Sequence, residues 1–109
     1  MLIDVSGIPF EVKEVESNSR EDPSMGRCDP KKALITINKE MPETVKDVTL
    51  IHEWLHGVLE NNGLPEISSN ETVICVLSTE LYRNGFKPKI INLGEMSTEA
   101  EGGTFSIKK

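Results

Sequence analysis

Cysteine is scarce in this chain, which contains only Cys28 and Cys75. Two cysteines this far apart cannot build the disulfide scaffold that is typical of small secreted domains. We therefore expect two free thiols, with Cys75 packed as a small hydrophobic side chain.

Positive charge is also in short supply, because 12 lysines and arginines face 18 aspartates and glutamates and leave a net charge of −6. A basic stripe that could neutralise phosphates is missing, which argues against nucleic-acid binding. The same acidity disfavours docking to an anionic membrane surface. We expect neither nucleic acids nor membranes among the partners.

Long apolar segments are missing as well, since the run VICVL, residues 73–77, is far too short to span a bilayer. The first ten residues, MLIDVSGIPF, lack the basic region, the long apolar core and the small-residue cleavage site of a secretory signal. These two absences lead us to expect a protein that stays in the cytoplasm.

The composition is otherwise typical of a folded domain, with 37% hydrophobic residues among 109 and no internal repeat. A chain of this length has room for one modest core. We predict a single domain over residues 1–93, with a polar loop at 17–24. Residues 94–109 are polar and contain glycine, so we expect a flexible C-terminal tail there.

The first third of the chain has the pattern of short strands. Residues 1–5 are mostly apolar, residues 8–12 alternate between apolar and other side chains, and a serine and a glycine mark a turn between them. Residues 25–29 and 33–38 predict two further strands. Three or four such strands in succession favour a small antiparallel meander.

Helical signals follow the strands. Pro42 suits the first position of a helix, and Asn62-Gly63 suits its end. A second helix is predicted over roughly residues 70–84. Strands followed by helices form an α+β pattern, in which the two main helices stack on one face of the sheet.

The stretch TLIHEWLHGVLENNG, residues 49–63, contains both histidines of the chain, His52 and His56. On a helical wheel the two histidines and Glu53 fall on one polar stripe. The opposite arc is filled by apolar side chains: Leu50, Ile51, Trp54, Leu55, Val58 and Leu59. A polar stripe is usually just solvated, so the stripe alone decides nothing.

The spacing within the stripe is more informative than its polarity. Imidazoles at positions i and i+4 of a helix lie one turn apart and can bind one metal ion when both are neutral. A glutamate directly after the first histidine lies beside that ion and can accept a proton from a water whose pKa the ion lowers. For this composition, a chance match to H-E-x-x-H has a probability of roughly 0.002. We therefore predict zinc ligation by His52 and His56, with Glu53 as general base.

A catalytic zinc ion needs a third protein ligand, and three glutamates are candidates. Glu60 shares the polar stripe, but it lies roughly 12 Å along the helix from the first histidine, which is too far. Glu71 falls in the first turn of the second helix, where Ser68 and Glu71 also have the spacing of a capping box. Glu80 falls within an apolar arc of that helix, where a carboxylate needs a partner. Spacing leaves Glu71 and Glu80 nearly even.

TLIHEWLHGVLENNGL followed by SNETVICVLSTELYRNGF resembles the small H-E-x-x-H metallopeptidase-like proteins of bacteriophages and prophages. This resemblance implies a minimal zincin-like fold, with a strand meander, an H-E-x-x-H helix and a second helix. Asn70-Glu71 is also similar to the Asn-Glu that opens the ligand helix of thermolysin-like gluzincins. By that similarity Glu71 is the third ligand of a His₂Glu zinc site with His52 and His56. The chain departs from the gluzincin pattern at Cys75, where those enzymes carry an aspartate that orients a ligand histidine.

The leading functional prediction is a zinc-dependent metallopeptidase that hydrolyses a peptide bond through metal-activated water, with Glu53 as general base. Its substrate is an unidentified peptide or protein, which the resemblance places along an edge strand near residues 25–29. The alternative is a noncatalytic zinc-binding structural or partner-binding module of a mobile genetic element, in which Cys28 or Asp29 closes the fourth zinc position. A third hypothesis is a metal-free interaction domain whose histidines face solvent.

Overall fold

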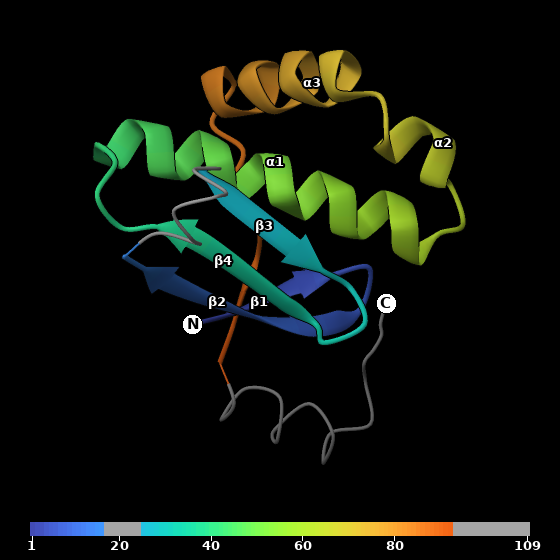
Figure 1. The fold of residues 1–109 in the computed structure, drawn as a ribbon, viewed down its shortest axis with the longest axis horizontal. Coiled ribbons are helices and arrows are strands. Elements are labelled where there is room, and N and C mark those ends of the chain that lie inside the picture. Colours follow the sequence, from blue (N-terminus) through green and yellow to red (C-terminus); the bar gives the residue numbers. More distant parts are fainter. Residues whose placement is uncertain (17–24, 93–109) are drawn as a thin grey trace.

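The computed structural model describes residues 1–16 and 25–92, which form five strands and three helices (Figure 1). The strands are β1 (Leu2–Val5), β2 (Ile8–Val15), β3 (Gly26–Asp29), β4 (Leu34–Asn38) and β5 (Ile90–Ile91). The helices are α1 (Glu43–Asn61), α2 (Pro65–Ser68) and α3 (Glu71–Arg83). The loop predicted at 17–24 and the tail predicted at 94–109 lie outside the described residues.

The strands of the described part form one sheet in the order β3-β4-β2-β1-β5. β1 and β2 form the expected hairpin, and its turn residues Ser6 and Gly7 have φ angles of 53° and 86°, as a tight two-residue turn requires. β3 pairs with β4 and β5 pairs with β1, both in antiparallel fashion. β2 and β4 are parallel, so the expectation of a purely antiparallel meander is wrong at this pairing. The reason is that β3 occupies the edge and β4 returns between β3 and β2.

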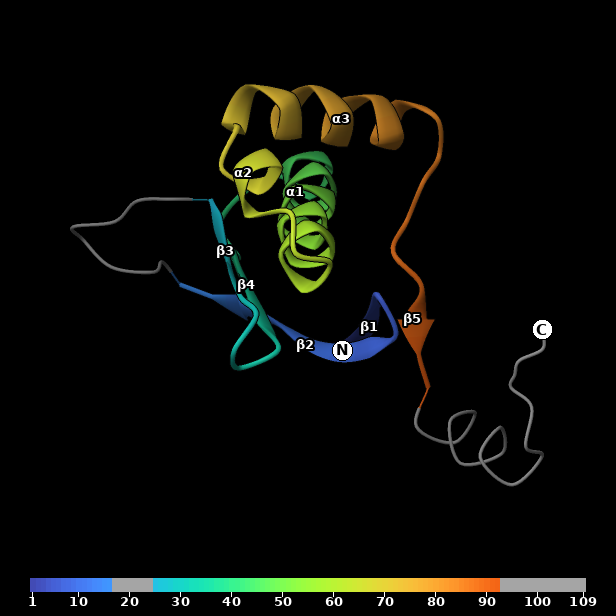
Figure 2. The same cartoon turned by 90° about the vertical axis from the view of Figure 1, so that its right-hand side faces the viewer.

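The two long helices stack on one side of the sheet, with α1 between the sheet and α3 (Figure 1, Figure 2). α1 begins at Glu43, one residue later than the sequence predicts because Pro42 is the N-cap, and it ends before Asn62 as expected. α3 begins after Asn70, whose side chain accepts a hydrogen bond from the backbone N–H of Val73. The α+β class with two main helices is thereby confirmed. The four-residue α2 and the two-residue β5 have no counterpart in the sequence patterns.

Helix α1 buries apolar side chains on two sides. Toward the sheet it packs against a cluster of buried strand residues: Ile3, Val5, Phe10, Val12, Ile35 and Ile37. Toward α3, a second buried cluster consists of Ile51, Leu55 and Ile74. The apolar arc of α1 therefore serves two interfaces. Within residues 1–16 and 25–92, none of the helices combines the length and the apolar character that crossing a membrane requires.

Gly57 allows α1 to approach the sheet closely, since a Cβ atom at this position would lie 2.9 Å from Cγ1 of Val5. Val5 is fully buried and cannot move aside. We expect Gly57→Ala to lower the free energy of unfolding by about 1–3 kcal/mol, the usual cost of overpacking, although alanine has the higher helix propensity. Urea unfolding followed by circular dichroism measures this change. Thr44→Ala, at an exposed position of the same helix, is the control, and equal stability of the two variants would contradict the close approach.

Candidate metal centre

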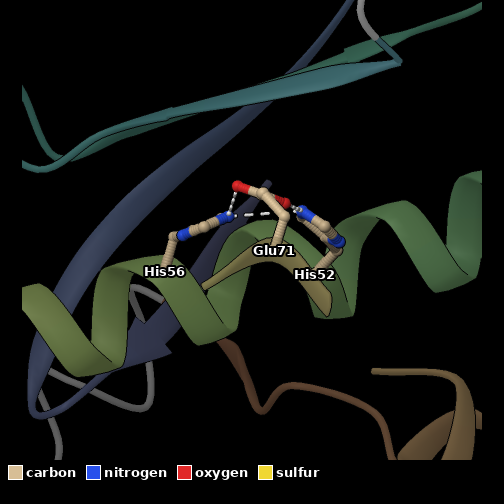
Figure 3. A group of neighbouring side chains, drawn as sticks. All are labelled: His52, His56 and Glu71. Carbon is tan, nitrogen blue, oxygen red and sulfur yellow. Dashed lines mark hydrogen bonds and ion pairs between the residues drawn. The ribbon is translucent and has the colours of Figure 1, made fainter. Parts of the chain in front are cut away.

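Helix α1 places His52 and His56 one turn apart, with their ring nitrogens converging (Figure 3). The two Nε2 atoms are 3.2 Å apart, and the ring centroids are 4.9 Å apart. Both side chains are largely covered, with exposed fractions of 20% and 13%. The i,i+4 spacing thus brings together two imidazole nitrogens at the surface of the helix.

The first turn of α3 brings Glu71 to these nitrogens. Its Oε1 lies 3.0 Å from Nε2 of His52, and its Oε2 lies 3.1 Å from Nε2 of His56. Asn70 caps the helix, so Glu71 occupies the first helical position with its carboxylate directed at α1. The alternative role of Glu71 in a capping box with Ser68 is not what the structure shows, because the Ser68 hydroxyl has other partners.

These side chains form the one group among residues 1–16 and 25–92 whose ligand atoms could share a metal ion, and the atoms all lie within 4.8 Å of one another. Two atoms bound to zinc at tetrahedral positions lie about 3.3 Å apart. Here the two Nε2 atoms are 3.2 Å apart, and each lies about as close to one of the two Glu71 oxygens, at 3.0 Å for Oε1 and 3.1 Å for Oε2. Two imidazoles and one carboxylate are also a ligand set of catalytic zinc sites, so the residues fit this ion.

The electrostatics of the site favour neutral imidazole at His52. Burial lowers the pKa of His52, and repulsion from His56 lowers it further, whereas Glu71 acts in the opposite direction. Only a neutral imidazole can bind a metal ion, because the proton of the charged form occupies the required lone pair. The lowered pKa therefore keeps the His52 imidazole neutral, and able to bind a cation, at neutral pH.

Cys28 and Asp29 do not join the ligand group in the part of the chain that the structure describes. Burial, followed by the negative charges of nearby carboxylates, raises the pKa of the Cys28 thiol to about 12. Cys28 therefore keeps its proton in the metal-free site, and its Sγ is not among the converging ligand atoms. Three protein ligands leave a fourth zinc position for water, which is the arrangement of catalytic rather than structural sites.

Cys75 lies beside the metal centre and not in the core. Both cysteines are free thiols, as expected, but Cys75 is exposed, so the prediction that it packs as a small hydrophobic residue is wrong. Its Sγ is 3.9 Å from Nδ1 of His52, on the opposite edge of the ring from Nε2. Cys75 thus stands where the gluzincin pattern has an orienting aspartate, and a thiol is the weaker hydrogen-bonding partner.

Glu80 lies away from the metal centre. Its carboxylate is 58% exposed, and its Oε2 is 3.7 Å from Nη1 of Arg83. Of the apolar neighbours that suggested a buried carboxylate, Leu81 packs against the cluster between α1 and α3, but the other three are exposed: Val73, Val76 and Leu77. Most of this arc faces outward, because α3 buries another side against α1. Geometry therefore brings Glu71, and not Glu80, to the histidines.

Glu53 is almost completely buried, with 7% of the residue exposed. Burial, followed by repulsion from Glu71, raises the pKa of its carboxyl group to about 7. A carboxyl group whose pKa lies near neutrality is well suited to accept and return a proton. Gly26 on β3 makes this close packing possible, since a Cβ atom there would lie 2.7 Å from Cγ2 of Thr49 and 3.3 Å from Cγ of Glu53.

A cleft of about 630 Å³ connects these groups. Its lining includes Glu53 and the three candidate metal ligands, together with residues of β3 and of α3. One side of the cleft is formed by Met25, Gly26 and Cys28. These residues belong to the segment 25–29, along which the resemblance to zincins places a substrate. The metal centre is thus reachable from a space large enough for a peptide segment.

Two residues to which the sequence argument gives no role at the site lie behind His56. Nδ1 of His56 is 2.8 Å from Oγ of Ser68, and this hydroxyl donates a hydrogen bond to Oε2 of Glu60 at 2.9 Å. Helix geometry excludes Glu60 as a ligand, but its i,i+4 spacing from His56 is a hint of a supporting role. The role of Ser68 could not be predicted in this way, because Ser68 lies on α2, a short helix that the sequence patterns do not predict.

Comparison of the chain with protein-family models, with curated proteins and with solved structures gives no match. The resemblance to phage and prophage H-E-x-x-H proteins therefore stays a prediction from the motif residues. A function for this chain has to be inferred from the geometry of His52, His56, Glu71 and Glu53.

Proposed function

We propose that this protein is a zinc-dependent peptidase. The observation behind this proposal is the convergence of two imidazole nitrogens and one carboxylate on α1 and α3, beside a buried glutamate in the same cleft. A merely solvated helix face would not gather three ligand atoms within 4.8 Å of one another. Burial of the intervening Glu53 costs free energy, and a buried carboxyl group in a cleft is typical of functional sites.

The residues of the cleft have different roles in the proposed reaction. His52, His56 and Glu71 would hold the ion, and a bound zinc ion lowers the pKa of water and polarises a peptide carbonyl. Glu53 accepts the proton that the water loses and then passes it to the leaving amine. The pKa of Glu53 is about 7 without a metal ion, and a cation held by the neighbouring ligands would lower it and favour the ionised carboxylate that accepts a proton.

We place the peptide substrate along β3, which is the edge strand beside the cleft. The backbone N–H of Asn38 on β4 donates to the carbonyl of Met25, and successive residues of an antiparallel strand direct their backbone groups to opposite sides. Gly26 and Cys28 therefore direct their N–H and C=O groups away from β4. An extended peptide can form backbone hydrogen bonds with these groups as an added strand.

Zinc content and peptide cleavage test this proposal together. Untagged protein, purified without added metal, is analysed by mass spectrometry for zinc and incubated with a mixed peptide library. We expect nearly stoichiometric zinc, and cleavage that a chelator stops and added zinc restores. A chain that binds no zinc even when zinc is offered overturns the proposal. Stoichiometric zinc without cleavage of any peptide would support the noncatalytic zinc-binding module instead.

A further inference from the structure

We propose that Glu60 is a positioning residue for the metal centre and acts on His56 through the hydroxyl group of Ser68. This inference rests on the proposed zinc site and concerns what holds one of its ligands in the binding state. Nδ1 of His56 lies 2.8 Å from Oγ of Ser68, and Oγ donates to Oε2 of Glu60 at 2.9 Å. The three groups form a hydrogen-bonded chain from the back of the imidazole ring to a carboxylate.

The protons that His56, Ser68 and Glu60 carry limit the directions of the two hydrogen bonds between them. An ionised carboxylate only accepts, so the single hydroxyl proton of Ser68 goes to Glu60. The Ser68 oxygen is then available to accept a hydrogen bond from Nδ1 of His56 when Nδ1 carries the imidazole proton. In this tautomer Nε2 of His56 keeps its lone pair for a metal ion, whereas without the ion Oε2 of Glu71, at 3.1 Å, favours a proton on Nε2. The two hydrogen bonds through Ser68 therefore favour the tautomer of His56 that can bind a metal ion.

The buried position of Ser68 strengthens its hydrogen bonds with His56 and Glu60. Ser68 is 2% exposed, so water competes little for its hydroxyl group. Its backbone N–H donates to the carbonyl of Leu64 at 3.1 Å, which holds the residue within α2. A carboxylate that acts on a ligand histidine fixes the ring orientation and raises the basicity of the ligating nitrogen.

The two histidines are supported unequally. Nδ1 of His52 faces the sulfur of Cys75 at 3.9 Å, which is a weak contact, whereas Nδ1 of His56 has a short hydrogen bond to a buried hydroxyl. The tautomer of His56 is therefore the better defined of the two. We infer that the link from His56 to Glu60 contributes more to zinc affinity than the contact of His52 with Cys75.

Zinc affinity, measured by competition with a chromogenic chelator, tests this role. We expect Ser68→Ala to bind zinc about 10–100-fold more weakly than wild type, the usual effect of losing an outer partner of a ligand. Glu60→Gln should weaken binding less, because its amide oxygen can still accept from Ser68. The double variant should bind no more weakly than Ser68→Ala alone, since Glu60 acts through Ser68. Ser69→Ala and Glu66→Gln make the same chemical changes at exposed positions of this segment and should bind like wild type.

The tautomer of His56 gives a second readout that requires neither zinc nor activity. In the metal-free Glu71→Ala variant at mildly alkaline pH, where no carboxylate competes for a proton on Nε2, nitrogen NMR should show the proton on Nδ1 of His56, and adding Ser68→Ala should move it toward Nε2. Loss of stability alone would not move this signal, and urea unfolding shows whether each variant is folded. Should Ser68→Ala fail to fold, Glu60→Gln, at an exposed position, is tested in the same two ways.

Two results would overturn the inference. One is wild-type zinc affinity in both Ser68→Ala and Glu60→Gln, and the other is a proton on Nε2 of His56 in metal-free Glu71→Ala, where the competing carboxylate is gone. Failure of wild type to bind zinc is a different result, because it contradicts the proposed function. The tautomer measurement still reports on the chain from His56 to Glu60 in that case.

Discussion

Glu53→Gln is expected to abolish peptide hydrolysis while zinc stays bound. The amide cannot accept the proton that water loses, whereas the ligand atoms of His52, His56 and Glu71 are unchanged. Positioned acid–base groups contribute about 10²–10⁴-fold to reaction rates, and we expect a loss at the upper end because Glu53 both accepts and returns the proton. Steady-state cleavage of the best peptide from the library, with zinc measured on the same samples, provides the comparison.

Glu66→Gln is the matched control for this variant. It removes the same negative charge from an exposed position on α2 that does not belong to the lining of the described cleft. It should cleave the peptide at the wild-type rate. Unchanged turnover in Glu53→Gln, with zinc fully bound, would contradict the assignment of the general base and require another group to take the proton.

Removal of a candidate ligand is expected to produce the second large effect. His52→Ala and Glu71→Ala should each lower zinc affinity by more than about 100-fold, since loss of one of three protein ligands exceeds the effect of losing an outer partner. Both variants, purified without added metal, should contain almost no zinc by mass spectrometry. We expect them to fold, because Glu71 is 63% exposed and His52 borders an open cleft.

Glu80→Ala distinguishes a ligand from any other glutamate of the same helix. It makes the same charge change on α3 as Glu71→Ala, at a side chain that is 58% exposed. It should retain zinc at the wild-type level, because its carboxylate faces away from the histidines. Loss of zinc in Glu80→Ala together with retention in Glu71→Ala would overturn the choice of the third ligand.

Two of the three candidate metal ligands could be predicted from the spacing of the sequence, because their relation to each other is local. Helix geometry alone sets the relation of His52 to His56, so the spacing of the two residues is sufficient to make their nitrogens converge. The third ligand is not local, and spacing left Glu71 and Glu80 nearly even until the resemblance favoured Glu71. The helical wheel of α3 was misleading, because an apolar arc is not necessarily a buried arc, and the residues around Glu80 are exposed: Val73, Val76 and Leu77.

The environment of the acidic residues was also beyond the reach of sequence patterns. Glu53 and Glu60 share the polar stripe of α1, yet Glu53 is buried beneath β3 while Glu60 is exposed. The close approach of Gly26 accounts for the burial of Glu53. Which polar residue becomes buried depends on the element that covers it, and a helical wheel contains no information about that neighbour.

By itself, the sequence determined the α+β class, the four main strands, the two long helices and the pairing of His52 with His56. These features depend on alternation, on helical periodicity and on turn residues, all of which act over a few neighbouring positions. Only the tertiary structure shows that β2 and β4 pair in parallel and that the Glu71 carboxylate lies beside the two histidines. The same is true of the hydrogen bonds that link His56 through Ser68 to Glu60. Each of these joins segments that are separate in the chain, and such contacts are set by how whole elements pack, which no local pattern specifies.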